Sequence, residues 1–255
     1  MYSLGIPVRN EEKTIESLIN SIFEQSLPPE EVLVCVNNSS DRTINIVENL
    51  ANQYDNLRVL QSAPGKARGW NKIIQETRNK VNIFCDGDIR FGNSETLEKL
   101  FYEFQEAEDL KMLGASVIQL PSKRMTPYKL TIPSGQLYVI DKEKIGVNAL
   151  PEDIINDDGY IVGMCYPHIS VTDKAFFYCN KPNLIDVYKT QMRILKGVRQ
   201  LLDMGMEEKM LSIIEMSKKK TKYKLLLELA KMLNVKNGDN LWEEARSTKK
   251  EVELS

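Results

Sequence analysis

The sequence predicts an α/β fold, a doubly wound sheet with helices on both faces. Segments typical of strands and of helices alternate through the first 120 residues, as they do in chains built from βαβ units. The segment VLVCV, residues 32–36, is apolar without interruption and rich in β-branched residues. Such a run is typical of a parallel strand that is covered on both faces.

Other short apolar runs that end at polar turns predict further strands. We expect them at residues 2–8, 57–60, 81–85, 113–120 and 134–140. The last range lies inside a proline-containing insertion, residues 121–156, which we expect to line a site. In open α/β sheets, ligands bind outside the carboxyl ends of the strands, so those ends are where functional side chains should gather.

Apolar residues spaced three or four positions apart predict the helices. We expect helices at residues 12–25, after Asp41, at residues 66–78 and after Ser94, with Asp41 and Ser94 as capping residues. The first helix should bury one apolar face, and so should the helix after Ser94. These two faces comprise Ile15, Leu18, Ile19 and Ile22 in the first, and Leu97, Leu100, Phe101 and Phe104 in the other.

From Asp186 onward the pattern is helical, so we predict a main domain of residues 1–200 and a helical extension of residues 201–255. An apolar face in residues 222–233 should pack on the domain, with pairing in a homodimer or contact with a lipid surface as alternatives. The residues of this face are Leu225, Leu226, Leu229 and Met232.

The bulk composition excludes several classes of protein. A net charge of −2 argues against a nucleic-acid partner. No apolar run approaches the roughly 20 residues that span a bilayer, and the first residues lack the pattern of a signal peptide. The four cysteines are far apart in the sequence, which predicts buried free thiols in a reducing compartment. We expect a cytoplasmic protein, at most peripheral to a membrane.

Polar residues follow three of the predicted strands. Asp86 and Asp88 flank a glycine directly after the strand at 81–85, residues 9–11 follow the first strand, and residues 37–40 follow the second. Two carboxylates in one turn can share Mg²⁺ or Mn²⁺ together with substrate phosphates. A solvated turn rich in Asp and Gly is the alternative for this pair.

Six segments occur in an order that resembles the family 2 glycosyltransferases of GT-A fold. They are IPVRNEEKTIESLINSIFEQ, VNNSSDRT, GKARGWNKI, FCDGDIRF, SGQLYVI with LPEDIINDDGYI, and QMRILKG. The similarity covers roughly residues 2–200. It implies a mixed sheet of GT-A type and the transfer of a sugar from a nucleotide diphosphate sugar.

The resemblance assigns roles on the donor side. Pro7, Arg9 and Glu11 would line the nucleoside pocket, with Glu11 reaching the ribose. Asn37 stands where relatives often have an Asp that reads the uracil edge, and an amide leaves the identity of the base more open. Lys66 would lie near the base or the diphosphate.

Through the same resemblance, Asp86 and Asp88 would hold the donor by way of Mg²⁺ or Mn²⁺, with Asp88 as the more direct ligand. Gln191 and Arg193 match a motif that would stabilise the diphosphate or shape the acceptor channel. Leu195 replaces the aromatic residue of that motif. This departure, together with the absence of an apolar span, favours a non-processive enzyme that adds one sugar.

Two acidic pairs compete for the role of general base. Asp158, with Asp157 as its neighbour, fits the family's position before a short helix better than the pair Glu152 and Asp153. A carboxylate there would take the acceptor's proton in an inverting transfer. The single histidine, His168, is expected to be structural, with metal ligation as the alternative.

The sequence thus predicts an inverting, metal-dependent glycosyltransferase. A UDP-sugar is the favoured donor, with a guanosine donor as the second choice. The acceptor, a saccharide, a lipid-linked molecule or a peptide, is not identified. A nucleotidyltransferase and a non-catalytic nucleotide-sugar binding module are the alternatives. The first of these usually carries a Gly-rich basic loop after its first strand, where this chain has IPVRNEE.

Overall fold

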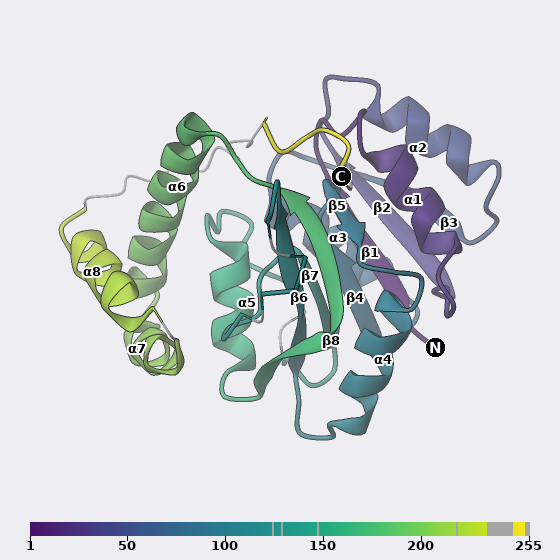
Figure 1. The fold of residues 1–255 in the computed structure, drawn as a ribbon. Coiled ribbons are helices and arrows are strands. Elements are labelled where there is room, and N and C mark those ends of the chain that lie inside the picture. The colour runs from purple at the N-terminus through teal and green to yellow at the C-terminus, as the bar shows by residue number, and fades with distance from the viewer. Residues whose placement is uncertain (124, 129, 147, 218, 234–246, 253–255) are drawn as a thin grey trace.

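The computed structural model describes residues 1–123, 125–128, 130–146, 148–217, 219–233 and 247–252. Within these residues one eight-stranded sheet has the order β3-β2-β1-β4-β7-β6-β8-β5 (Figure 1). The strands are β1 (Ser3–Val8), β2 (Glu31–Asn37), β3 (Leu57–Ser62), β4 (Val81–Cys85), β5 (Ile89–Phe91), β6 (Met112–Leu120), β7 (Leu137–Asp141) and β8 (Ile169–Asn180).

Strands β3, β2, β1 and β4 run parallel, and β7 runs antiparallel to both β4 and β6. The sheet is therefore mixed, as the resemblance implied. The parallel part ends its strands at one edge, which places the turns after β1, β2 and β4 side by side. This edge is called the rim below.

Helices cover both faces of the sheet. The helices α1, α2 and α4 pack with one apolar cluster, and α3 and α5 pack with another on the opposite face. The helices are α1 (Ile15–Phe23), α2 (Thr43–Ala51), α3 (Lys66–Glu76), α4 (Thr96–Glu106), α5 (Asp157–Cys165), α6 (Leu184–Asp203), α7 (Glu207–Met216) and α8 (Lys220–Lys231). The predicted apolar faces of α1 and α4 are buried.

Strand β2 is covered on both sides, as its unbroken apolar run predicted. Alternate side chains contact opposite clusters: Val32, Val34 and Val36 face one, and Leu33 and Cys35 face the other. Period-two alternation of side chains produces this division between the two faces. All four cysteines are buried and free, so the predicted thiols are confirmed.

Two predicted caps differ from the structure. Ser94 is not a cap: α4 begins at Thr96, and Asn93 Oδ1 accepts hydrogen bonds from the Glu95 amide and the Thr96 hydroxyl. Asp41 does bind the Thr43 amide and hydroxyl at the start of α2, but Arg42 occupies the N-cap position. Short polar side chains just before a helix compete for these groups, so sequence alone places caps only to within a residue or two.

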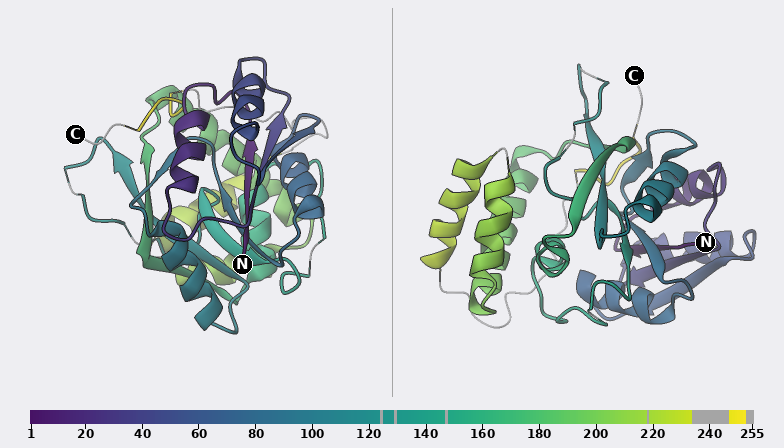
Figure 2. Two further views of the ribbon diagram at one scale, coloured as in Figure 1. Left: turned by 90° about the vertical axis from the view of Figure 1, so that its right-hand side faces the viewer. Right: turned by 90° about the horizontal axis from the view of Figure 1, so that it is seen from below.

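The C-terminal helices stand beside the domain as a separate layer (Figure 2). Helix α8 packs on α6 through a small cluster of Val198, Ile214, Leu227 and Ala230. Of the predicted face, Leu226 is partly buried there, but Leu225, Leu229 and Met232 are exposed. The expected packing of this face on the domain is therefore wrong, whereas the alternatives, pairing in a homodimer or contact with a lipid surface, stay predictions.

The predicted domain boundary at residue 200 falls inside α6, so the division into a domain and an extension stays a prediction. Residues 234–246 and 253–255 of the predicted extension lie outside the described residues. Among the helices that the structure describes, none combines the length and the apolar character needed to cross a bilayer.

Candidate active site

The first turn of the rim follows β1 and directs Glu11 inward. Asn10 adopts a left-handed conformation with φ of 55°, which Asn tolerates better than most residues. Its side chain accepts a hydrogen bond from the Ser40 amide at 2.8 Å, and the Glu11 amide donates to the Thr43 hydroxyl at 2.8 Å. These bonds join the turns after β1 and β2 into one unit.

Glu11 is buried, with its carboxylate directed toward the turn after β4. The Thr14 hydroxyl donates to Oε2 at 3.0 Å. A Cβ at Gly87 would lie 2.9 Å from Glu11 Cγ, so the glycine between the two aspartates makes room for Glu11. Burial raises the pKa of Glu11 to about 8, and Asp88 adds to the rise, whereas Lys249 and Thr14 oppose it.

The turn after β4 carries Asp86 and Asp88. The Asp86 amide donates to the Gln136 carbonyl at 2.9 Å, which ties this turn to the segment before β7. Burial raises the pKa of Asp86 to about 6, Lys66 opposes the rise, and Asp88 and Asp158 add to it. Carboxylates that crowd one another in a buried site would be relieved by a divalent cation, so this pair fits a metal.

No three His, Cys, Asp or Glu side chains in the described part of the chain form a ready metal cluster. Mg²⁺ and Mn²⁺ in nucleotide sites commonly use one or two carboxylates and take further oxygens from phosphates. Asp86 and Asp88 are therefore the residues that could hold such an ion, together with a bound diphosphate.

Lys66 opens helix α3 and lies among three carboxylates. Its Nζ is 3.1 Å from Asp86 Oδ1, 3.6 Å from Asp157 Oδ2 and 3.5 Å from Asp158 Oδ1. Burial alone would lower the pKa of Lys66, but Asp157, Asp158 and Asp86 together raise it well above its ordinary value. The ammonium stays charged and links the turn after β4 to the start of α5.

Asn37 is fully buried and binds the backbone just before Lys66. Its Nδ2 donates to the Gly65 carbonyl at 2.6 Å, and its Oδ1 accepts from the Gly65 amide at 2.9 Å. Gly65 has φ of 132°, a conformation that side-chain-bearing residues rarely adopt. Asn37 therefore holds the turn that starts α3. The contact of Asn37 with the base stays a prediction. Such a contact would require Asn37 to share or break its two hydrogen bonds to Gly65.

The two acids that start α5 face different surroundings. Asn156 is the N-cap and accepts from the Gly159 amide at 3.1 Å. The Asp157 side chain is 8% exposed, and burial followed by the nearby Asp158 raises its pKa. The Asp158 side chain is 33% exposed. A Cβ at Gly135 would lie 1.8 Å from Asp158 Oδ1, so Asp158 occupies space that only a glycine leaves open.

A cavity of about 270 Å³, called the rim cavity here, opens at this edge of the sheet. It brings together most of the residues that the sequence singled out. The predicted site residues that line it are Pro7, Glu11, Lys66, Asp86, Asp88, Asp158 and Arg193. Arg9, Asn37, Asp157 and Gln191 are not part of its lining, and Thr190, the neighbour of Gln191 on α6, lines it instead.

The competing acidic pair lies at a different hollow. Glu152 and Asp153 line a cavity of about 150 Å³ together with Lys66, Asp157 and Arg193. Glu152 binds Arg68 at 3.0 Å and is largely exposed. Neither acid of this pair lines the rim cavity that Asp86 and Asp88 share with Asp158. The geometry therefore favours Asp158 as the candidate base.

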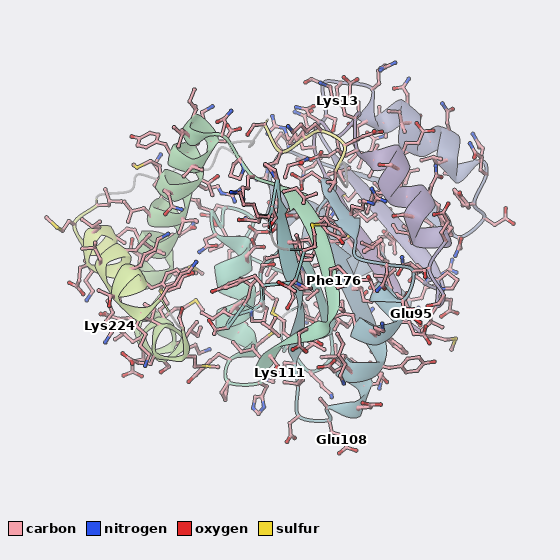
Figure 3. All side chains as sticks on the ribbon, viewed as in Figure 1. Lys13, Glu95, Glu108, Lys111, Phe176 and Lys224 are labelled. Carbon is pink, nitrogen blue, oxygen red and sulfur yellow. The ribbon has the colours of Figure 1, made fainter. Side chains whose placement is uncertain are left out.

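His168 lies far from the rim. Its carbonyl accepts from the Lys111 and Met112 amides, where β6 begins. In Figure 3, Lys111 is labelled at the lower end of the molecule, whereas the segment at residues 247–252 crosses the upper end. Strand β6 starts at the edge opposite to the ends of β1 and β4. The His168 side chain is exposed and lies away from Asp86 and Asp88, so it does not join the candidate metal site, and its structural role stays a prediction.

Sequence reasoning missed two groups of residues. Strand β8 supplies Cys179 and Asn180 to the rim cavity, and the β-branched and aromatic composition of ISVTDKAFFYCN could have predicted this strand. Lys249 also lines the rim cavity and binds Glu11. No local pattern could have found Lys249, because it lies in a polar segment far from every motif.

Comparisons with known proteins identify the family of the chain. A model of the family described as "Glycosyl transferase family 2" matches residues 3–172. The chain is 30% identical over 207 residues to the poly(ribitol-phosphate) beta-N-acetylglucosaminyltransferase TarS of Staphylococcus aureus, covering 71% of this chain and 35% of TarS. The chain thus spans about a third of the length of this curated relative.

A second relative comes from Methanococcus voltae and is a dolichyl N-acetyl-alpha-D-glucosaminyl phosphate 3-beta-D-2,3-diacetamido-2,3-dideoxy-beta-D-glucuronosyltransferase. It is 22% identical over 233 residues, covering 80% of this chain and 71% of its own length.

Solved structures share the fold. A crystal structure of S. aureus TarS 1-349 in complex with UDP-GlcNAc superposes with a TM-score of 0.64 at 20% identity, covering 89% of this chain and 70% of that one. A mannosyltransferase from Pyrobaculum calidifontis in complex with GDP-Man and Mn²⁺ gives 0.66 at 16% identity, covering 90% and 72%. At these identities the likeness shows the GT-A fold alone. Since the family model spans more than half of the sequence, the chain belongs to glycosyl transferase family 2.

Proposed function

We propose that this protein transfers one sugar from a nucleotide diphosphate sugar to an acceptor hydroxyl, with inversion at the sugar carbon. One observation carries the proposal. The rim cavity brings Glu11, the paired acids Asp86 and Asp88, and the candidate base Asp158 into one space. A donor that runs from Glu11 past Asp86 and Asp88 would present its sugar toward Asp158.

The chemical step needs a base at one end and positive charge at the other. The acceptor oxygen would attack the anomeric carbon while the bond from that carbon to the diphosphate oxygen breaks, and the electron pair leaves with the diphosphate. Asp158 would take the acceptor's proton. Lys66 and Arg193 both line the rim cavity and would place fixed positive charge beside the diphosphate.

The same chemistry favours a divalent cation. Asp86 and Asp88 would hold Mg²⁺ or Mn²⁺ on the diphosphate, and such an ion supplies charge that stabilises the leaving group. The presence of Mn²⁺ with GDP-Man in the Pyrobaculum structure supports this assignment. Asp86 and Asp88 would supply two carboxylates to the ion, and the donor would supply the remaining oxygens.

A UDP-sugar is the proposed donor, and UDP-GlcNAc is the first to test. TarS, the 30% identical relative, is named as an N-acetylglucosaminyltransferase, and its structure holds UDP-GlcNAc. The GDP-Man in the Pyrobaculum structure makes a guanosine donor the second choice. Because both polar atoms of the Asn37 amide bind Gly65, the preferred base must be measured directly.

A panel of nucleotide sugars tests the proposal. Release of the free diphosphate would be measured for UDP, GDP, CDP and dTDP sugars, with Mn²⁺ and with chelator, in the presence of mixed saccharide and lipid-linked acceptors. We expect metal-dependent turnover that is fastest with a UDP-sugar. Fastest turnover with a GDP-sugar would overturn the uridine assignment alone. Binding without turnover of any donor would instead favour a non-catalytic module.

A further inference from the structure

A short segment near the C-terminus reaches the rim from the far end of the chain. Residues 247–252, called the C-terminal strap here, cross the upper end of the sheet between α6 and the turn after β1 (yellow in Figure 1). Two of its side chains, Thr248 and Lys249, line the rim cavity. The strap is therefore part of the wall of the proposed donor site.

The start of the strap is bound to the first turn of α6. The Ser247 amide donates to Asp186 Oδ2 at 2.9 Å, and the Asn183 amide donates to the Ser247 hydroxyl at 3.0 Å. Asn180, the last residue of β8, donates through Nδ2 to the carbonyls of Thr248 at 3.2 Å and Lys250 at 2.8 Å. The backbone on both sides of Lys249 is thus fixed.

The end of the strap is held by packing and by one further bond. Val252 is buried in a small cluster with Ile118, Leu120 and Tyr178. Arg90 of β5 donates through Nη1 to the Val252 carbonyl at 3.2 Å. Anchors on β5, β8 and α6 together fix where the Lys249 side chain enters the site.

Lys249 binds the acid that we place at the ribose. Its Nζ lies 2.7 Å from Glu11 Oε1 and also donates to the Arg9 carbonyl. The two side chains are 13% and 8% exposed, so this ion pair is largely shielded from water. Each carboxylate oxygen of Glu11 thus has its own partner, Lys249 at Oε1 and Thr14 at Oε2.

We propose that Lys249 is a donor-positioning residue, which fixes the Glu11 carboxylate in the orientation that accepts the hydroxyls of the nucleotide's ribose. This inference rests on the proposed function. A carboxylate offers about four acceptor positions, and the bonds from Thr14 and Lys249 leave acceptor capacity for the ribose. The positive charge of Lys249 also offsets the repulsion between Glu11 and the nearby Asp88.

The first test compares two neighbouring lysines in the full chain. Lys250 carries the same charge, but its side chain is exposed, so Lys250→Met is the matched control for Lys249→Met. Binding of UDP in the presence of Mn²⁺ would be measured by titration calorimetry. We expect a Kd at least tenfold higher for Lys249→Met and within about twofold of wild type for Lys250→Met, the scale of one lost charged contact.

A double-mutant cycle separates positioning from a general structural role. If Lys249 acts through Glu11, Lys249→Met should change the Kd by less than about twofold in a Glu11→Gln background. Lys249→Arg, which keeps the charge, should restore most of the affinity. Additive effects of the two substitutions would overturn the inference.

Tighter UDP binding by Lys249→Met would also overturn it, since the strap would then compete with the nucleotide. Wild-type protein that binds none of the nucleoside diphosphates would instead overturn the proposed function. Wild-type binding that Lys249→Met leaves unchanged would remove the inference alone.

Discussion

The two acidic pairs of the site differ in how many of their side chains reach the rim cavity. Asp86 and Asp88 are two residues apart in a turn, and both line the rim cavity. Asp157 and Asp158 are adjacent at the start of a helix, where successive side chains point about 100° apart. Asp158 lines the cavity, whereas Asp157 is buried beside Lys66.

This difference shows that not every acidic side chain in a sequence motif can contact a ligand. In the turn, the intervening Gly87 makes room for Glu11, and Asp86 and Asp88 both line the rim cavity. On the helix, Lys66 binds both acids, at 3.6 Å and 3.5 Å, and only the more exposed one faces the cavity. Substitutions in the two pairs therefore test two different roles.

The largest effect is expected at the turn. Asp88→Asn should nearly abolish transfer, because it removes one of the two carboxylates that would hold the metal on the diphosphate. Titration calorimetry with UDP and Mn²⁺ should show weaker binding. Asp109→Asn, at an exposed aspartate before β6, is the control. Equal UDP affinity in Asp88→Asn and wild type would remove the metal role from this turn.

A smaller effect is expected at the helix. Asp158→Asn should lower the transfer rate roughly a hundredfold or more, the scale typical of general-base loss. Donor affinity should change little, because Asp158 would act on the acceptor. Steady-state kinetics with the preferred donor would measure this, with Asp153→Asn as the comparison. An inactive Asp153→Asn beside an active Asp158→Asn would move the base to the competing pair.

The smallest effect is expected from the glycine that makes room for Asp158. Gly135→Ala adds a methyl group where Asp158 Oδ1 would be 1.8 Å away, so the carboxylate must shift. A misplaced catalytic group lowers the rate, and we expect a loss of roughly tenfold to a hundredfold. The melting temperature and the Kd for UDP should stay close to wild type.

Ser134→Ala is the matched control for that change. The neighbouring Ser134 hydroxyl is buried, and the described residues offer it no hydrogen-bond partner, so its removal should leave the rate almost unchanged. A Gly135→Ala variant with wild-type kinetics would show that the rate does not depend on the position of Asp158. The proposed difference between the two acidic pairs would then be contradicted.

Much of the fold could be predicted because it depends on local patterns. The strand at 81–85 was placed at its observed bounds, and the apolar stripes of α1 and α4 are buried as expected. Helix ends were less predictable: α1 begins at Ile15, not at residue 12, because residues 11–14 form the turn that positions Glu11. The expected packing of the α8 face was wrong, because three consecutive leucines fit two helical stripes and the stripe with Leu227 is the one that is buried.

The sequence by itself determined which turns meet at the rim, since parallel strands of similar length end at one edge and carry their following residues with them. Glu11, Asp86 and Asp88 are there for that reason. Tertiary structure alone decided that Gly135 leaves space for Asp158 and that Lys249 binds Glu11. These contacts join residues far apart in the chain, and packing between elements, which no local periodicity encodes, brings them together.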